Sequence, residues 1–439
     1  MQPGIMSAPH SLEDVHVHRD LISSLLLRTL AMADQLSGAA LEERVGLPFE
    51  LLQPLIDEFQ RAQLMDTVGF ANGSDLDGLA IPLRMAYTIS SSGRQRAGEM
   101  SAVQTRYLGP CPLRLDDYVE LIASQLVERT TITDSSLKRA LGELQLDQQV
   151  IDQIGGAMVS RSSLFIFGAP GNGKSTITER MALLMGDPIE IPHAVAVGDE
   201  IIRLLDPVYH HLASGPQPAD KRLVRIERPR VMVGGELRLN QLELTYDAAN
   251  RYYEAPLQWK ANGGVFVVDD FGRQEEPPMR LLNRFIVPME KKVDYLDLSA
   301  SGRKIELPFL CQMVFSTNLS PASLVDEAFL RRMAYKIGVA NPTPEAYGRI
   351  LTYECAKHSV EWVPQAVPFL LSLYDRDKRP LRGAHPRQII NRLVDFAAYR
   401  QLPAKLSPQS LEEAYEACFH AALGEVVEED WSQPTAHGV

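Results

Sequence analysis

The sequence contains few cysteines, and they are far apart. Four occur among 439 residues, at positions 111, 311, 355 and 418, and no two of them form a C-x-x-C pair. Zinc-binding motifs and the disulfide frameworks of small secreted domains use closely spaced cysteines. The pattern therefore predicts free thiols in a reducing compartment, and we expect the protein to be cytoplasmic.

Long apolar runs are lacking as well. A membrane-spanning helix needs about 18 consecutive apolar residues, and no segment of the sequence reaches this length. The apolar stretch 21–33 follows the acidic residues Glu13, Asp14 and Asp20, whereas a signal peptide begins with basic residues. We therefore expect neither a membrane span nor a secretion signal.

Positive charge is scarce. The chain has 44 lysines and arginines against 56 acidic residues, a net charge of −12, and residues 1–100 hold seven arginines, no lysine and thirteen acidic residues. Affinity for a nucleic-acid backbone comes from lysine and arginine, so nucleic acid is not an expected partner. Apolar residues make up 45% of the chain, which is typical of a globular protein, and the length suggests two or three domains at about 100–200 residues each.

A glycine-rich segment carries the strongest signal. Residues 168–175 read GAPGNGKS, which matches the phosphate-binding loop pattern G-x-x-x-x-G-K-[ST]. The run 164–167 predicts a buried strand before it, and 176–185 predicts a helix after it. In this arrangement backbone N–H groups bind phosphate oxygens, the lysine reaches the β- and γ-phosphates, and the serine hydroxyl binds magnesium. We predict that ATP and Mg²⁺ are bound here, by Gly168, Ala169, Pro170, Gly171, Asn172, Gly173, Lys174, Ser175 and Thr176.

Two further apolar runs end in polar residues suited to this chemistry. The run 264–268 is followed by Asp269 and Asp270. The first carboxylate can hold magnesium beside Ser175, and the second can polarise an attacking water. The run 310–317 ends in Asn318, whose amide can orient that water, although an asparagine is also common in an ordinary turn at the end of a strand.

Three arginines complete the set. Arg331 and Arg332 follow the strand that ends at Asn318, and Arg387 ends the sequence GAHPR in a helical region near the C-terminus. In this order the motifs resemble those of the AAA+ ATPase superfamily over about residues 150–425. They correspond to Walker A, Walker B, sensor 1 at Asn318, an arginine finger at Arg331 or Arg332, and sensor 2 at Arg387.

The resemblance implies an α/β fold: a P-loop αβα core with a parallel sheet of strand order 5-1-4-3-2, followed by an α-helical lid. It implies an ATPase with a magnesium site at Ser175 and Asp269. ATP would lie between subunits of a homo-oligomeric ring, for which we expect a hexamer. An arginine of one protomer would reach the γ-phosphate bound by the next, because a guanidinium stays charged and offers paired donors. The residues with implied catalytic roles are Lys174, Asp270, Asn318, Arg331, Arg332 and Arg387.

The sequence departs from the superfamily pattern at three points. The second Walker B acid is Asp270 instead of glutamate, which predicts slow turnover or a shifted backbone, because a general base must come within hydrogen-bond reach of its water. Lys174 and Asp269 are 95 residues apart, and we assign the excess length to an insertion at about 212–262, interpreted as an added hairpin or small sheet. The segment 196–198 lacks the aromatic residue of a protein-threading pore loop. Threading is therefore not predicted.

The pattern divides the chain into five regions. They are an interaction domain at 11–100, a helical linker at 101–150, the nucleotide-binding core at 151–340, the lid at 341–425 and a tail at 426–439. The first region predicts three helices and a small hairpin, an order similar to that of a winged helix. A hairpin is also predicted at 293–307, where several AAA+ branches, including the MoxR-like chaperones, carry a hairpin that contacts partners.

Three functions fit these features. The first is a chaperone-like ATPase that remodels or regulates a protein partner selected by the N-terminal domain. The second is a DNA-linked ATPase or transcriptional regulator, in which the third helix would enter the major groove. That helix carries Glu50, Asp57 and Glu58 against Arg61, which favours a protein partner. The third is a slowly hydrolysing, nucleotide-switched scaffold, which the aspartate at position 270 would suit.

Overall fold

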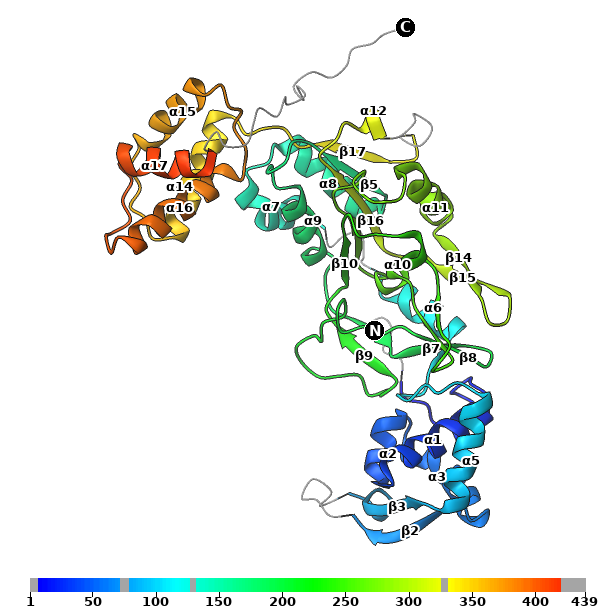
Figure 1. Cartoon of the computed structure of the whole chain (residues 1–439). Coiled ribbons are helices and arrows are strands. Elements are labelled where there is room, and N and C mark those ends of the chain that lie inside the picture. Colours follow the sequence, from blue (N-terminus) through cyan, green and yellow to red (C-terminus); the bar gives the residue numbers. More distant parts are fainter. Residues whose placement is uncertain (1–6, 72–78, 127–131, 325–330, 420–439) are drawn as a thin grey trace.

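The computed structural model describes residues 7–71, 79–126, 132–324 and 331–419. Its elements form a bundle of helices at one end, two groups of strands in the middle and a second helical bundle at the other end (Figure 1). Within the described residues, no helix has both the length and the apolar character needed to cross a membrane.

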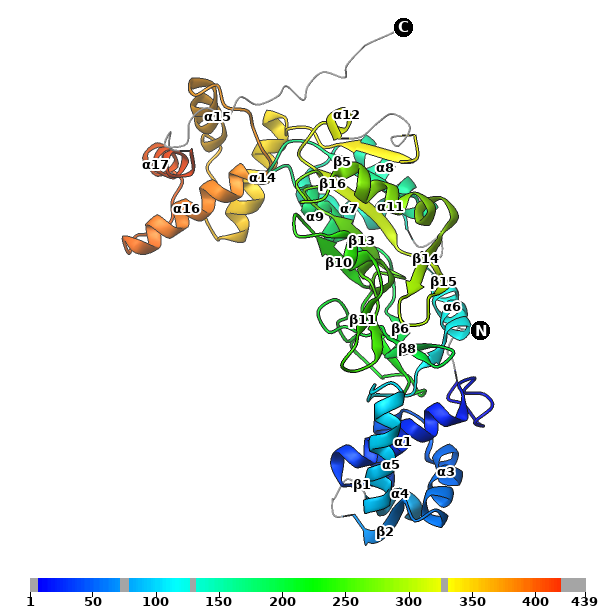
Figure 2. The same cartoon turned by 45° about the vertical axis from the view of Figure 1, so that its right-hand side comes forward.

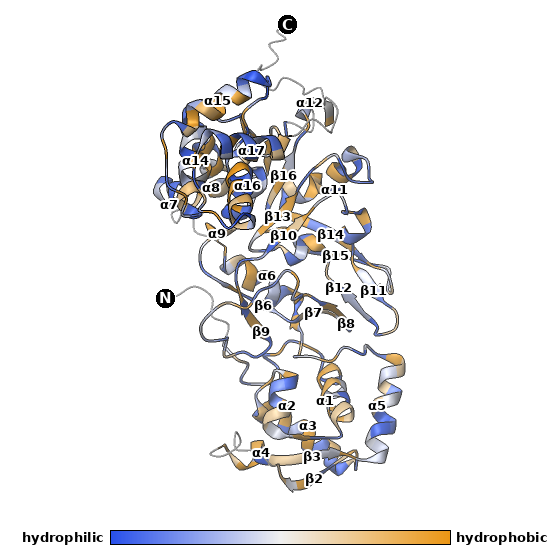
Figure 3. Cartoon of the chain, turned by 60° about the vertical axis from the view of Figure 1, so that its left-hand side comes forward, coloured by the Kyte–Doolittle hydropathy of each residue, from blue (hydrophilic) through white to orange (hydrophobic). Residues whose placement is uncertain are grey.

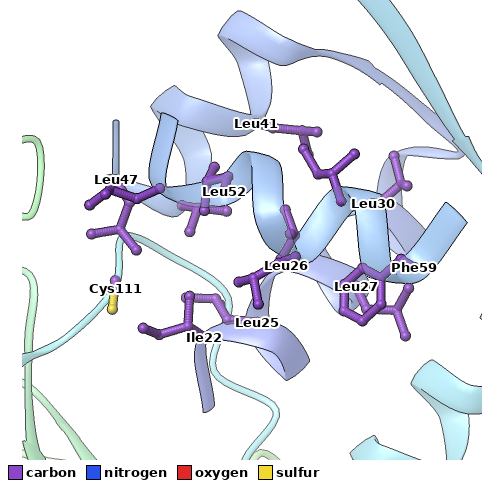
Figure 4. Packing of buried hydrophobic residues seen from close by; sticks show 14 of the residues in the cluster. Ile22, Leu25, Leu26, Leu27, Leu30, Leu41, Leu47, Leu52, Phe59 and Cys111 are labelled. Atoms are coloured by element: carbon purple, nitrogen blue, oxygen red, sulfur yellow. The ribbon is translucent and has the colours of Figure 1, made fainter. Parts of the chain in front are cut away.

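The N-terminal unit packs helices against a three-stranded antiparallel sheet in the order β1-β3-β2. Helix α3 buries an apolar stripe against α1 that includes Leu52, Leu55, Ile56 and Phe59, at the three- and four-residue spacing of one helix face. Figure 4 shows Leu52 and Phe59 of α3 in the same cluster as leucines of α1 such as Leu26 and Leu27. The elements are α1 Arg19–Ala33, β1 Gln35–Ser37, α2 Gly38–Val45, α3 Phe49–Arg61, β2 Met65–Phe70, α4 Ile81–Arg84, β3 Met85–Ile89 and α5 Ser91–Val103.

A linker of short helices leads into the central part. Its last helix, α8, ends three residues before the first core strand, and an arginine in the left-handed conformation, Arg161, terminates it. The elements are β4 Leu113–Arg114, α6 Leu115–Ser124, α7 Asp134–Leu141, the 3-10 turn η3 Gly142–Leu144 and α8 Gln148–Ser160.

The central sheet is parallel, and its five strands run β10-β13-β16-β5-β17. Numbered by their order in the core, the strands read 2-3-4-1-5, which confirms the predicted order 5-1-4-3-2. All four residues of β13 are buried, as expected for a parallel strand covered by helices on both faces. The elements are β5 Leu164–Phe167, α9 Lys174–Leu183, β10 Arg230–Val233, α10 Leu257–Lys260, β13 Val265–Val268, α11 Pro278–Lys291, β16 Gln312–Thr317, α12 Pro321–Leu324 and β17 Tyr335–Gly338.

The predicted insertion at 212–262 differs from what the structure shows. Arg230–Val233, interpreted as part of an added hairpin, is β10 of the central sheet, and 239–242 is a 3-10 turn instead of a strand. The added sheet has the order β11-β12-β8-β7-β4 and so combines two strands from within the predicted insertion, β11 and β12, with three that precede it. Its strands and neighbours are β6 Ile189–Pro192, β7 Ala194–Val197, β8 Glu200–Arg203, β9 Leu223–Ile226, η4 Leu239–Leu242, β11 Thr245–Asp247 and β12 Tyr252–Glu254.

The hairpin expected at 293–307 is present as β14 (Val293–Leu298) paired with β15 (Arg303–Pro308). The lid is an all-helical bundle around its own apolar core, placed to one side of the central sheet (Figure 2). Colouring by hydropathy shows apolar and polar residues alternating along its helices, as amphipathic packing requires (Figure 3). The lid helices are α14 Pro344–Lys357, α15 Ala366–Arg376, α16 His385–Tyr399 and α17 Pro408–Phe419.

Candidate nucleotide-binding site

The predicted phosphate-binding loop lies between β5 and α9. Gly168, Gly171 and Gly173 all have positive φ, at 146°, 82° and 86°, a region that favours glycine. A Cβ on Gly168 would lie 2.3 Å from the carbonyl oxygen of Val339, the residue that follows β17, so no larger residue fits. Helix α9 then begins at Lys174, which leaves the N–H groups of its first turn at the loop.

Lys174 is buried, with 6% of its surface exposed. Its Nζ donates to the carbonyl oxygens of Gly168 at 2.9 Å and Ala169 at 3.0 Å, and to Oδ1 of Asn318 at 2.5 Å. Burial lowers the pKa of Lys174 to about 8, while the carboxylates of Asp269 and Asp270 act in the opposite direction. The ammonium group is therefore held at the carboxyl ends of β5 and β16 by oxygen acceptors.

The predicted magnesium ligands lie together. Ser175 Oγ, in the first turn of α9, donates to Oδ2 of Asp269 at 2.8 Å. Asp269 follows the buried strand β13, which places its carboxylate at the same sheet edge as the loop. The remaining loop residues complete the turn: Ala169 is buried, Pro170 is exposed and Thr176 is half-buried in α9.

Asp270 and Asn318 are also brought together. Asn318 Nδ2 donates to Asp270 Oδ1 at 2.6 Å, so the amide bridges Lys174 and Asp270. Asp270 has a φ of 47°, a left-handed conformation that aspartate tolerates better than most residues. Gln274 Nε2 donates to the backbone oxygens of Asp269 at 3.2 Å and Asp270 at 3.4 Å and supports this turn, a role that the sequence did not suggest.

The predicted arginines occupy three different environments. Arg332 is exposed and forms an ion pair with Glu290 of α11, with 2.6 Å between Nε and Oε1. Arg331, the preceding residue, is also exposed, and it lies a few residues before β17 begins. Arg387 lies exposed in the first turn of α16.

Arg382 is the arginine of the lid that lies beside the loop, and the sequence interpretation missed it. It is buried, with 5% of its surface exposed, and its positive charge acts to lower the pKa of Lys174. Its Nη1 donates to Oδ1 of Asn341. A single charged residue in a loop has no periodicity to mark it, and its place before the GAHPR sequence is the only signal that could have singled it out.

A cavity of about 100 Å³ adjoins the loop on the side of the lid. Apolar and polar side chains of the linker and of α14 line it, and a hydrogen bond of 2.6 Å from Arg349 Nε to Gln145 Oε1 joins those two elements. Asn172 of the phosphate-binding loop and Gly383 of the lid both line this cavity. Its lining includes Leu144, Leu146, Val150, Asn172, Ile350 and Gly383.

The strand order of the central sheet and the phosphate-binding loop at the carboxyl end of β5 together identify the type of fold. The chain has an AAA+ ATPase-type fold. Residues 343–417, which span the lid, match a family model described as a domain of unknown function, DUF8689. No curated protein matches the sequence.

Solved structures with a similar arrangement include NtrX from Brucella abortus in complex with ATP, with 13% identity and a TM-score of 0.39. The match covers 65% of this chain and 62% of that chain, so this chain spans less than two thirds of NtrX. Another is RuvB from Thermotoga maritima, a Holliday junction branch migration motor, with 11% identity, a TM-score of 0.36, and 62% of this chain and 69% of that chain covered.

Proposed function

We propose that this chain is an ATPase that binds MgATP at the loop between β5 and α9 and hydrolyses it. The observation that carries the proposal is the convergence of Lys174, the Ser175–Asp269 pair and the Asp270–Asn318 pair at one sheet edge. A buried ammonium, N–H groups at a helix N-terminus and a carboxylate for a metal ion are the groups that a triphosphate requires.

The donor set fits magnesium. Mg²⁺ is usually held by one or two protein oxygens together with phosphate oxygens and water, and Ser175 and Asp269 supply a hydroxyl and a carboxylate 2.8 Å apart. When bound, the ion would neutralise phosphate charge. The chain's own residues orient the ligand: Lys174 binds phosphate oxygens, and the loop N–H groups fix their positions.

Asp270 is our candidate for the general base. Asn318 holds its carboxylate by a hydrogen bond of 2.6 Å, next to Lys174. An aspartate placed by a left-handed backbone can reach a water beside the phosphates, where it would accept the proton of the attacking water. The contact with Asn318 limits its freedom, which supports slow turnover.

The cavity beside the loop is our candidate site for the base of the nucleotide. Leu144, Leu146, Val150 and Ile350 supply apolar surface for a flat aromatic ring, polar residues such as Asp147 and Asn341 line the rest, and Asn172 belongs to the cavity and to the phosphate-binding loop.

We also propose that the chain forms a homo-oligomer and acts on a protein partner. Exposed Arg331 and Arg332 support a homo-oligomeric ring, hexameric by our expectation, in which one subunit supplies an arginine to the next.

The N-terminal unit exposes Val68, Phe70 and Ile81 at 59%, 61% and 65%, and its charge is negative. Both features support a protein partner for a chaperone-like remodelling activity, and the four free cysteines support a cytoplasmic location.

Two substitutions test the ATPase proposal. Lys174→Ala should abolish ATP binding, because it removes the buried cation. Asp270→Ala should retain binding but lower hydrolysis by about 10²–10⁴-fold, the usual contribution of a general base. Lys138→Ala, which removes an exposed lysine paired with Asp134 on α7, is the matched control. Unchanged ATP binding by the Lys174 variant in calorimetry would refute the proposal.

A further inference from the structure

A cavity of about 490 Å³ lies between the N-terminal unit and the added sheet. Its walls come from α1, from the end of α5 and the residues after it, from β8, β11 and β12 with their turns, and from the tip of the hairpin β14–β15. In Figure 1 this is the place where α1 approaches β7 and β8. Ligand pockets usually measure about 300–1,000 Å³, and this cavity shares no lining residue with the phosphate-binding loop. It is therefore a second candidate site for a small molecule.

Arg28 of α1 is a buried arginine in the wall of this cavity, with 4% of its surface exposed. Its Nε donates to the backbone oxygen of Ser24 at 3.1 Å, and its Nη1 donates to that of Thr105. Among the described residues, its Nη2 has no hydrogen-bond partner and no carboxylate forms an ion pair with it. Burial lowers the pKa of Arg28 to about 10, so the guanidinium keeps its charge at neutral pH.

Another arginine of the protein shows the usual arrangement at this depth. Arg222 is 2% exposed and donates from Nε and Nη2 to the two carboxylate oxygens of Asp220, at 2.7 to 3.1 Å. A buried charge without such a partner costs free energy of folding. The guanidinium of Arg28 therefore lacks a counter-ion that the cavity has room to hold.

Ser24 provides a second unsatisfied group at the same place. It lies one helical turn before Arg28, on the same face of α1, and it also lines the cavity. It is 1% exposed, and its Oγ has no hydrogen-bond partner among the described residues. Because buried polar groups are nearly always hydrogen-bonded, the guanidinium and the hydroxyl together indicate a negatively charged ligand group beside them.

Three carboxylates line the same cavity. Asp20 and Asp199 are exposed, and Glu200 is half-buried. The rings of Tyr246 and Tyr253 line it as well, with 4.9 Å between their centroids. Carboxylates and tyrosine rings both attract an ammonium group. The lining thus offers a place for a positive ligand group in addition to the negative one.

These charges favour a zwitterion over a phosphate. Of the other ionisable side chains in the lining, Arg251 donates to the backbone oxygen of Ala102, and His18 is exposed. Three carboxylates repel a phosphate group, which carries roughly two negative charges. A carboxylate carries one negative charge, which a single guanidinium balances, and an ammonium group on the same ligand turns the repulsion into attraction.

We propose that this cavity binds a zwitterionic small molecule of the amino-acid class, with its carboxylate beside Arg28 and Ser24 and its ammonium group near the three carboxylates. Attraction between opposite charges acts across about 4–6 Å, so the ligand stabilises the guanidinium without displacing its bonds to Ser24 and Thr105. An amino acid and a short peptide carry the same pair of charges. The site is independent of the proposed ATPase activity.

The first test measures thermal unfolding of the full chain with each standard L-amino acid, with a set of dipeptides and with inorganic phosphate. At least one amino acid or dipeptide should raise the unfolding midpoint, because a ligand that binds only the folded state stabilises it. The dipeptides distinguish a peptide ligand from a free amino acid. If neither class raises the midpoint, or if phosphate alone does, the proposal is wrong.

Variants of the strongest ligand and of the protein then locate the two charges. The amide of that ligand lacks the carboxylate and its N-acetyl form lacks the ammonium group, so each should bind more weakly in calorimetry. Arg28→Met should weaken binding about tenfold or more, as expected for loss of a charged partner. Arg19→Met is the matched control, because Arg19 is an exposed arginine of the same helix, paired with Glu58. Undiminished binding by the Arg28 variant would overturn the proposal.

Stability without ligand separates this role from a structural one. Replacing an unpaired buried charge by an apolar side chain of similar length removes a desolvation cost. Arg28→Met should therefore be at least as stable as the wild type when no ligand is present, although it gains less from the ligand. A clearly lower unfolding midpoint of the free variant would show that Arg28 holds the fold together and would count against a ligand site. Saturating ATP should not displace the ligand, and competition between the two would contradict a separate site.

Discussion

Lys174 is a buried lysine whose charge depends on its surroundings. Burial lowers its pKa to about 8, against a usual value of 10.5. Phosphate oxygens favour the charged form, so the ammonium must be protonated in the complex. As the pH rises through 8, the free protein loses this proton and binding must recover it.

We therefore predict that ATP affinity is nearly constant up to about pH 7, is about halved at pH 8, and falls by about tenfold per pH unit above that. The last proton of a phosphate leaves near pH 6, so the ligand does not titrate in this window. Calorimetric titrations at several pH values in buffers of different ionisation enthalpy measure both the affinity and the proton uptake. Affinity that stays flat to pH 9.5, with no proton uptake, would contradict the assigned pKa.

At the same scale, the sequence predicted residues that belong to a fixed pattern and missed those that act through tertiary contact. The spacing of Gly168, Gly173 and Lys174 predicts the loop by itself, because each glycine adopts a positive φ that other residues disfavour. Arg382 and Asn341 are neighbours of the loop only because the lid docks there. A sequence pattern confined to one element cannot reveal such a contact.

Among the elements, the hairpin β14–β15 is tied to helix α11 by a buried ion pair. Arg284 donates from Nη1 and Nη2 to both carboxylate oxygens of Asp294, at 2.7 and 3.1 Å, and from Nε to Glu243 at 2.7 Å. The Asp294 side chain is only 5% exposed. Since α11 follows the turn that carries Asp269 and Asp270, this pair links the site to the hairpin.

Breaking the pair should destabilise the protein. Asp294→Ala leaves a guanidinium in a poorly solvated position, so we expect a loss of about 3 kcal/mol in the free energy of unfolding. Asp297→Ala, on the same hairpin, removes a partner of Lys304 in an exposed pair and should change stability by less than about 1 kcal/mol. Urea denaturation monitored by circular dichroism gives both values, and equal effects of the two substitutions would show that the buried pair contributes no more than a surface one.

β10 was predicted to belong to the insertion, but it is a strand of the central sheet, and the reason for this error is physical. Strands β5, β13 and β16 lie inside the parallel sheet; β5 and β13 are apolar throughout and β16 has an apolar centre, Met313–Phe315, which made them recognisable. β10 is an edge strand, with Arg230 exposed and Met232 half-buried. Its alternation is the same as that of a half-exposed hairpin strand, so the sequence could not distinguish a core edge from an insertion.

For the molecule as a whole, the arginines at 331 and 332 bear on assembly. Both are exposed, and Arg332 is paired with Glu290 of α11 on the same chain. On the proposed function, an arginine from this region completes the site of a neighbouring subunit. Hydrolysis per subunit should then rise with protein concentration until the ring is formed.

Mixing two inactive variants tests the same idea without relying on concentration. A double variant, Arg331→Ala with Arg332→Ala, keeps its own loop but cannot supply an arginine, whereas Lys174→Ala supplies the arginine but cannot bind ATP. Each alone should be inactive. In a mixed ring the first variant gains the arginine of the second, and at equal amounts about a quarter of the wild-type activity should return if subunits mix at random and an arginine from the neighbour contributes 10³-fold or more. If the mixture stays inactive although light scattering shows mixed oligomers, then neither Arg331 nor Arg332 completes the site of the neighbouring subunit, and the catalytic arginine lies elsewhere.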